Sequence, residues 1–386
     1  MNYPNFLLTS WLILLLFIMP TCPKKNDTVV TINLLNHGFK ETALSSIADD
    51  INYIPLSRDS IIGFIIKIIY RNGYFYIGAN KYKLLKFNNE GKFETSIGKM
   101  GEGPGEFLDY ADFDVGNGSG IIYILSSQQK KLFKYNSSGD FIEEISLSLN
   151  YPSRIRESND TLLIYHLNNS GDNQYGFELL DLHGKIFKRF PNNYKFKVGN
   201  TKVGFAGECL LYDYQGKPVF KEISSDTIFC IERLEKKPKY IINPGEYKFS
   251  NRLRENFNGD LSKFKNAIMQ SNITETDDFL FYTYFLENKV HYLVYNKKAS
   301  SQYEINGATG FKNDFDGGLN VVFKTNIYDN TLLTWIDAYQ LKAHVASDAF
   351  KNSTPKFPEK KKELEKLANS LNENDNPVLM LVKLKE

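Results

Sequence analysis

The sequence predicts an all-β fold, a six-bladed β-propeller of four-stranded antiparallel blades, from three observations. The chain of 386 residues holds 24 Tyr, 29 Phe and 2 Trp, together 14%, and aromatic side chains favour strands. A pattern of strand, glycine-containing turn and strand recurs, with its turn glycines at Gly91, Gly139 and Gly184. Helices of 10–15 residues, which an α/β fold needs between its strands, are missing from most of the chain. A period near 45 residues with four β-runs per unit is typical of propeller blades, which bury their faces by stacking around an axis.

Each blade is expected to run from its innermost strand outwards. The expected strands are Phe64–Arg71, Tyr74–Gly78, Lys83–Asn88 and Lys92–Ile97 for blade one; Tyr110–Gly116, Ile121–Leu125, Lys131–Asn136 and Phe141–Leu147 for blade two; Ser153–Glu157, Thr161–His166, Gly176–Asp181 and Lys185–Phe190 for blade three; Glu208–Tyr214, Pro218–Ile223, Thr227–Glu232 and Lys239–Ile242 for blade four; Ile273–Asp277, Phe279–Phe285, Lys289–Tyr295 and Gln302–Ile305 for blade five; and Val321–Ile327, Thr331–Gln340 and Val378–Lys383 for blade six.

Blade six is then one strand short, and the missing strand is available at the other end of the body. The run Ile51–Leu56 belongs to no unit of its own. We expect it to close the ring as the outermost strand of blade six, beside Val378–Lys383. Closure leaves no long free edge, and Pro55 fits an outer edge, where a missing N–H costs least.

Two insertions have helical spacing. Residues 252–270 and 358–371 place apolar side chains at steps of three and four. They lie among the long connections, which all fall on one face of the disc, where rigid scaffolds tend to carry binding loops. Two interpretations stay open: a lid over the axial channel, or helices that only cover the blade rim.

The N-terminus predicts export. Residues 6–19 are an apolar run too short to span a membrane, so residues 1–21 are expected to form a signal peptide. Cys22 follows, as at the lipid-bearing position of a bacterial lipoprotein, with residues 22–50 as a tether and N-terminal segment and 51–386 as the propeller. The alternative is a plain secretory signal or a short anchor with an incidental cysteine. Cys209 and Cys230 fall on non-neighbouring strands, so both are expected as free thiols.

The candidate ligand-binding residues lie on two connections. Glu106 and Asp109 follow the glycine-rich stretch 98–105, and Lys312, Asp314 and Asp316 precede blade six. The glycines fit a tight turn better than a phosphate cradle, because no helix follows them. Paired acids are ligands for Ca²⁺, but turn chemistry also explains Asn-Asp-Phe-Asp-Gly-Gly. No cofactor is therefore expected, and a metal site stays undetermined.

Several functions find no support in the sequence. The formal net charge is only +2, which gives no reason to expect nucleic-acid binding. The five histidines show no metal-binding spacing, and no nucleophile motif of the G-x-S-x-G kind occurs. No catalytic residue is therefore assigned.

Four segments carry a family resemblance. They are the stretch Ile97–Phe107 (IGKMGEGPGEF) with Asp112–Val115, the stretch Phe311–Gly318, the terminal Asn376–Val382, and the N-terminus up to Cys22. Together they resemble the six-bladed β-propeller lipoproteins common in Bacteroidetes, which are similar in pattern to NHL repeats. The resemblance implies six blades, an envelope location and a lipid anchor, and it implies no established activity.

We therefore expect a monomeric, non-catalytic binding or scaffold propeller that is lipid-anchored to the outer membrane, on a side that the sequence does not indicate. It would engage a protein, carbohydrate or other extracellular ligand through its loop-rich face. The alternative is a Ca²⁺-dependent, lactonase-like hydrolase or lyase with an axial metal, which rests on fold analogy alone. A purely structural envelope protein is a third alternative.

Overall fold

The computed structural model describes residues 29–35, 37–80, 83–199, 201–255, 257–328 and 330–385. The expected signal peptide (1–21) and the expected lipidation site Cys22 lie outside these residues. Within them, no helix is both long enough and apolar enough to cross a membrane.

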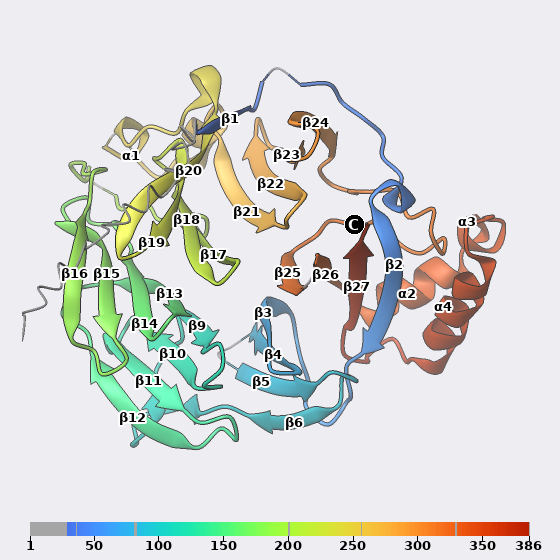
Figure 1. The fold of residues 1–386 in the computed structure, drawn as a ribbon, viewed down its shortest axis with the longest axis horizontal. Helices are drawn as coiled ribbons and strands as arrows, with labels where there is room; N and C mark the ends of the chain where they lie inside the picture. The colour runs from blue at the N-terminus through green and yellow to red at the C-terminus, as the bar shows by residue number, and fades with distance from the viewer. Residues whose placement is uncertain are drawn as a thin grey trace, which may run out of the picture.

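Six sheets stand around a central axis, which confirms the predicted six-bladed propeller (Figure 1). The four strands that form each blade pair antiparallel, and the strand innermost in the ring is β3, β9, β13, β17, β21 or β25. The glycines of the first three outer turns, Gly91, Gly139 and Gly184, have φ of 80°, 91° and 86°. These positive angles explain why the recurring turn needs glycine.

The bounds of the blade strands are β3 Ile65–Arg71, β4 Tyr74–Ala79, β5 Lys83–Asn88 and β6 Phe93–Ser96 in blade one; β9 Asp112–Val115, β10 Ile122–Ser126, β11 Lys131–Tyr135 and β12 Phe141–Ser146 in blade two; β13 Pro152–Ser158, β14 Thr161–His166, β15 Tyr175–Asp181 and β16 Ile186–Pro191 in blade three; β17 Cys209–Tyr214, β18 Lys217–Glu222, β19 Thr227–Glu232 and β20 Glu235–Asn243 in blade four; β21 Met269–Glu275, β22 Phe279–Leu286, β23 Lys289–Asn296 and β24 Ser301–Asn306 in blade five; and β25 Thr325–Tyr328, β26 Thr331–Ile336, β27 Val378–Leu384 and β2 Ala48–Pro55 in blade six.

The ring closes as predicted. Strand β2 pairs antiparallel with β27, with Ile51 opposite Val382 and Pro55 opposite Val378. The outermost strand of blade six therefore comes from the N-terminal part of the chain, and the other three come from the C-terminal part (Figure 1).

Residues 29–35 and 37–47, here called the N-terminal strap, lie along the rim of three blades (Figure 1). Strand β1 (Val30–Asn33) adds a fifth, parallel strand to blade four, next to β20. Further along, Lys40 N donates to Glu304 O of blade five at 2.8 Å, and Leu44 N donates to Lys312 O at 2.7 Å. The sequence did not predict this fifth strand.

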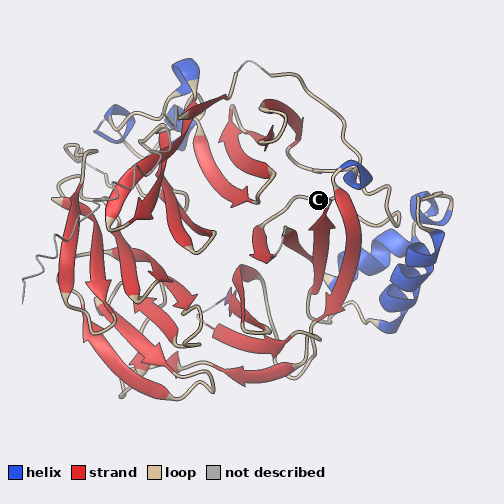
Figure 2. Ribbon diagram, in the orientation of Figure 1, coloured by secondary structure: helices blue, strands red, loops and turns tan. Residues whose placement is uncertain are grey.

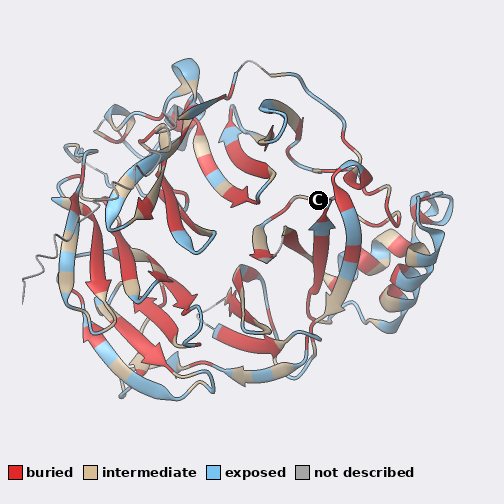
Figure 3. Cartoon of the chain, viewed as in Figure 1, coloured by how far each residue is buried: buried red, intermediate tan, exposed pale blue. Residues whose placement is uncertain are grey.

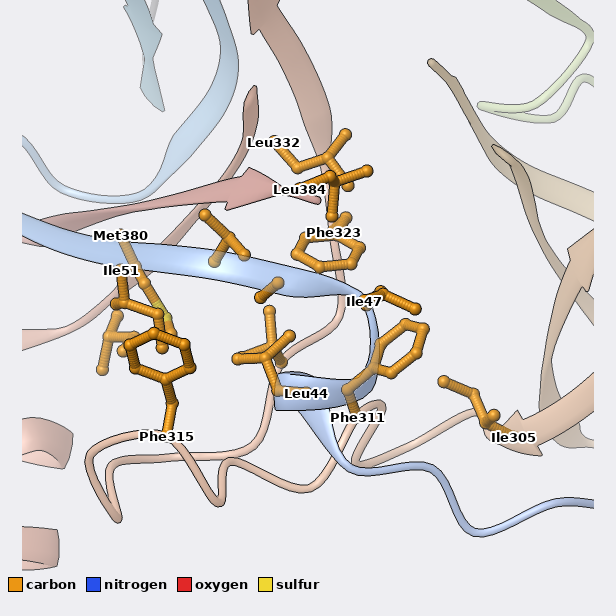
Figure 4. Close-up of a cluster of buried hydrophobic side chains, with 14 of the residues drawn as sticks. Leu44, Ile47, Ile51, Ile305, Phe311, Phe315, Phe323, Leu332, Met380 and Leu384 are labelled. Carbon is orange, nitrogen blue, oxygen red and sulfur yellow. The ribbon is translucent and has the colours of Figure 1, made fainter. Parts of the chain in front are cut away.

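The core is divided into clusters between neighbouring blades, and buried residues concentrate on the inner and middle strands (Figure 3). One cluster joins blades five and six, the short 3₁₀ helix of the strap (Leu44–Ser46), and the C-terminal strand. Its labelled members in Figure 4 are Leu44, Ile47, Ile51, Ile305, Phe311, Phe315, Phe323, Leu332, Met380 and Leu384.

A group of three helices lies outside the ring, beside blade six (Figure 2). They are α2 (Ala338–Ala346), α3 (Asp348–Lys351) and α4 (Pro358–Ser370), and α4 confirms the helix expected over 358–371. Lys360 Nζ of α4 lies 2.6 Å from Asp50 Oδ1 of β2. These helices cover the blade rim, so the interpretation as a lid over the axis is not supported.

The expected helix over residues 252–270 was wrong. Residues 252–270 do not form one helix: α1 covers only Arg252–Glu255, and a 3₁₀ turn covers Leu261–Phe264. Gly259 between them has φ of 98°, and the Asp260 carboxylate caps the second turn by accepting from Ser262 N at 2.9 Å. The apolar spacing is met by turns that bury Phe257, Phe264 and Ala267.

Strand positions also differ. The strand expected over Thr331–Gln340 ends at Ile336, because good helix formers follow Asp337 and begin α2. The inner strands of blades five and six begin at Met269 and Thr325, not at Ile273 and Val321.

Candidate functional site

The five residues proposed from the sequence are held in hydrogen bonds and ion pairs, either within their own connection or to neighbouring segments. Glu106 lies on β8 (Glu106–Phe107), which pairs in parallel with β7 (Lys99–Met100). Its carboxylate accepts from Lys99 Nζ at 2.7 Å and from Gly103 N at 2.9 Å. The pKa of Glu106 is lowered, mainly by the hydrogen bond from Lys99 and to a smaller extent by the one from Gly103.

Asp109 caps the turn between β10 and β11. Its Oδ1 accepts from Ser126 Oγ at 2.6 Å and from Gln128 N at 3.1 Å. The carboxylate is buried, so it shapes this turn.

The other three residues join the connection before blade six to the strap and to β2. Asp314 accepts from Ser45 N (2.9 Å) and Ser45 Oγ (2.6 Å). Asp316 accepts from Tyr53 Oη at 2.8 Å, and Lys312 contributes backbone hydrogen bonds to the strap. Burial raises the pKa of Asp316, although the hydrogen bonds that its carboxylate accepts lower it. The structure therefore does not bring the five residues into one site.

The axis of the ring holds a cavity that the sequence did not assign. It has a volume of about 570 Å³, within the range of small-molecule sites. All six inner strands contribute to its wall. Charged residues of the lining are Lys67, Arg71, Asp112, Asp114, Arg154, Arg156, Asp213, Glu275, Asp277 and Lys324.

An ion pair spans one end of this cavity. Arg71 is the last residue of β3 in blade one, and Asp213 lies near the end of β17 in blade four, the opposite blade. Their side chains meet with Arg71 Nη2 3.5 Å from Asp213 Oδ2. Burial raises the pKa of Asp213, and Arg71 opposes that effect. The cavity is therefore bridged at the end where the inner strands turn into the second strands.

Carboxylates of blade two fix the neighbouring blade. Asp112 Oδ2 accepts from Ile155 N at 3.0 Å, and Asp114 Oδ2 accepts from Glu157 N at 2.7 Å. Asp112 Oδ1 also accepts from Lys67 Nζ at 2.6 Å. Burial and the nearby Arg156 lower the pKa of Lys67 to about 8, although Asp112 and Asp114 raise it. These acids join blades one, two and three.

Glu275 is neutralised from outside the lining. It is fully buried, and Oε1 lies 2.7 Å from Lys239 Nζ and 2.6 Å from Lys297 Nζ. Two phenols, Tyr212 and Tyr240, also donate to it, at 2.9 and 3.0 Å. The cluster joins blades four and five, and the Glu275 carboxylate is paired with cations that lie outside the lining.

At the opposite end from the Arg71–Asp213 pair, two cations have no carboxylate within 4 Å among the described residues. They are Arg154, near the start of β13, and Lys324, just before β25. Lys324 Nζ lies 3.9 Å from the Trp335 ring centroid. Ile66, 53% exposed, is part of the same wall. This end is called the cavity mouth below.

One sequence signal could have found the cavity. Charged residues sit at every second position of two expected inner strands, as in Asp112 with Asp114 and Arg154 with Arg156. Alternate residues of a strand lie on the same face of its sheet, so such a pair on an inner strand indicates a polar surface near the axis. The described residues contain no group of three or more His, Cys, Asp or Glu side chains able to hold a metal ion. Cys209 and Cys230 are free, as expected.

Comparisons with known proteins agree on the fold. A crystal structure from Bacteroides fragilis, of a protein whose name calls it exported, superposes with a TM-score of 0.72 at 20% identity, covering 93% of this chain and all of that one. A member of the DUF4221 family from Bacteroides vulgatus superposes with a TM-score of 0.52 at 12% identity, covering 88% and 97%. No curated protein matches the sequence. The model of a family described as a domain of unknown function, DUF4934, matches residues 29–383.

Proposed function

The chain belongs to the DUF4934 family, a domain of unknown function, so its function has to be inferred from its own site. We propose that it is a non-catalytic binding protein of the cell envelope that holds a small ligand in the axial cavity. This moves the binding site from the loop-rich rim, where the sequence placed it, to the axis.

The axial cavity carries this proposal. All six blades contribute to a space of about 570 Å³, and the Arg71–Asp213 pair spans one end of it. Such a space is large enough to hold a small molecule, and the ion pair narrows the way through the axis. Preformed concave sites with a few placed polar groups are the usual form of ligand pockets.

The bonding of the acids favours binding over catalysis. A general acid or base has to exchange a proton with the substrate. Asp112 and Asp114 instead accept backbone N–H groups of β13, and Glu275 lies between two lysines. These carboxylates hold the blades together.

The envelope location rests on two observations. The sequence begins with the signal-like residues 1–21 followed by Cys22, and the similar Bacteroides fragilis protein is called exported. We propose a lipid anchor at Cys22 in the outer membrane. Two or more acyl chains hold a protein stably at a bilayer.

Equilibrium dialysis against a small-molecule extract of the cell envelope, read by mass spectrometry, tests the binding function. Ser271 is exposed and lines the cavity, so Ser271→Trp should fill the space. Ser301→Trp, on the exposed start of β24, is the matched control. Compounds enriched by the native chain and by Ser301→Trp, but not by Ser271→Trp, are expected. Equal enrichment by both variants, or none by the native chain, would refute the proposal.

A further inference from the structure

We propose that the ligand is a small anion with an apolar or aromatic part, whose anionic group lies between Arg154 and Lys324 at the cavity mouth. This inference rests on the proposed function, and it names the class of ligand that the site selects.

The first step is the distribution of charge along the axis. Lys67 forms an ion pair with Asp112, and Arg71 forms one with Asp213. Arg156 lies 3.8 Å from Asp112 and 3.9 Å from Asp114. Of the five cations that line the cavity, only Arg154 and Lys324 lack a carboxylate within 4 Å among the described residues. Among the lining cations of the described residues, those without a carboxylate within 4 Å thus lie at the mouth.

The opposite end has the opposite sign. Asp277 follows β21 at the turn into β22, and its carboxylate accepts from Tyr214 Oη at 3.1 Å and Gln215 Nε2 at 3.0 Å. No cation lies within 4 Å of it in the described part of the chain. An anionic group is therefore attracted to the mouth and repelled from the far end.

Arg154 is held ready for such a group. Its Nη2 donates to Ala206 O and its Nη1 to Ser153 O, both at 2.8 Å. Carbonyl oxygens fix the guanidinium without cancelling its charge. A guanidinium has five N–H donors, so donors remain for a carboxylate, phosphate or sulfate.

Lys324 lines the same cavity from the opposite blade. It precedes β25 in blade six, whereas Arg154 lies on β13 in blade three. Two like charges across one opening favour an anion between them. The Trp335 ring under Lys324 and the exposed Ile66 of the adjacent blade one supply apolar surface beside the charge. Together they fit an anion that carries an aromatic or aliphatic group.

Tryptophan fluorescence gives a direct test. The sequence has two tryptophans, Trp11 and Trp335. Trp11 lies in the proposed signal peptide, so in the chain from residue 23 onwards Trp335 is the only tryptophan, and it lines the cavity. Phenylacetate and its neutral counterpart phenylacetamide are the probes, because they differ in charge and hardly in shape.

Phenylacetate is expected to change the emission of Trp335 in a saturable way, more weakly at higher salt, and phenylacetamide is not. Arg154→Gln and Lys324→Gln should each weaken binding by about tenfold or more, since a hydrogen bond to a charged group is lost. Lys298→Gln removes an exposed cation of blade five that is not part of the cavity lining and should bind as the native chain does. Thermal melts confirm that each variant is folded.

Equal response to both probes, response to neither at millimolar concentration, or unchanged binding in both mouth variants would overturn the anion proposal. The dialysis experiment separates this failure from that of the proposed function. If the compounds enriched by the native chain but not by Ser271→Trp are neutral or cationic, the binding function stands and the proposal of an anionic ligand is refuted. If the native chain and Ser271→Trp enrich the same compounds, both the proposed function and the proposed class of ligand are refuted.

Discussion

Replacing Glu275 by Gln is expected to destabilise the ring at the junction of blades four and five. The carboxylate is fully buried and accepts from both Lys239 and Lys297, at 2.7 and 2.6 Å. The amide keeps the shape of the side chain but removes its charge. Two ammonium groups are then left facing each other with no counter-ion in a buried place.

Removing one partner of a buried ion pair costs about 3–5 kcal/mol. Unfolding entropy near the midpoint is about 2.1 cal/mol/K per residue. For the roughly 355 residues over which the family match extends, this gives about 0.75 kcal/mol/K. The variant Glu275→Gln should therefore melt about 4–7 °C below the native chain.

Glu232 offers a matched control. Its carboxylate also lies between two lysines, Lys217 at 2.7 Å and Lys237 at 2.8 Å, but its side chain is 34% exposed. Water screens such pairs, which contribute little. In a calorimetric melt at neutral pH, Glu232→Gln should change Tm far less than Glu275→Gln. Equal losses in both variants, or no loss in Glu275→Gln, would show that burial does not set the strength of this cluster.

The pH dependence of Glu275→Gln gives a second readout. Burial lowers the pKa of Lys239 to about 8 even though Glu275 raises it. Without Glu275 this pKa falls further, so the folded variant releases its proton at a lower pH than the native protein. Stability rises with pH wherever the unfolded state binds more protons. The deficit in Tm should be largest at low pH, shrink as the pH approaches about 8, and then stay constant.

Three further predictions concern the strap, a buried lysine and metal binding. Leu44→Ala should lower the free energy of unfolding by about 2–5 kcal/mol, because Leu44 is fully buried, whereas Phe39→Ala, at 67% exposure, should change it little; denaturant titration compares them, and equal effects would contradict the role of the cluster in Figure 4. Burial lowers the pKa of Lys221 to about 7, so its charge is disfavoured in the folded state, and native stability falls as the pH drops from about 10 to 7; the change in Tm caused by Lys221→Met should be more positive at pH 6 than at pH 9, and a pH-independent change would refute this. Adding Ca²⁺ and then EDTA should leave Tm unchanged, whereas a ligand at 100 times its Kd adds about 2.7 kcal/mol; a Ca²⁺-dependent rise would contradict this, and Asp314→Asn and Asp316→Asn would then show whether the ion binds at the connection before blade six.

Much of the propeller could be predicted because its signals are local and repeated. The glycines at 91, 139 and 184 mark turns that need positive φ, and the unassigned run at 51–56 was needed to complete blade six. The strap was missed because Val30–Asn33 pairs in parallel with a strand more than 200 residues away. The sequence of a four-residue strand does not indicate which strand it pairs with when that strand is so far away along the chain.

The helix expected over 252–270 failed because apolar spacing alone does not distinguish a helix from a series of turns. The Asn-Gly-Asp at 258–260 was the break that the pattern ignored. The axial cavity was missed for a different reason. Arg154 and Lys324 lie 170 positions apart, on opposite blades, and only the closed ring places them at one mouth.

The closure of blade six has a consequence for the order of synthesis. Strand β2 is complete at residue 55, but its partner β27 ends at residue 384. Chains grow at about 5–20 residues per second, so about 330 further residues take roughly 15–65 s. For all of that time β2 waits without its partner, with an unpaired edge and apolar side chains such as Ile51. Exposed strand edges are sites of aggregation, so this edge of the nascent chain is open to pairing with other chains until its last residues are made.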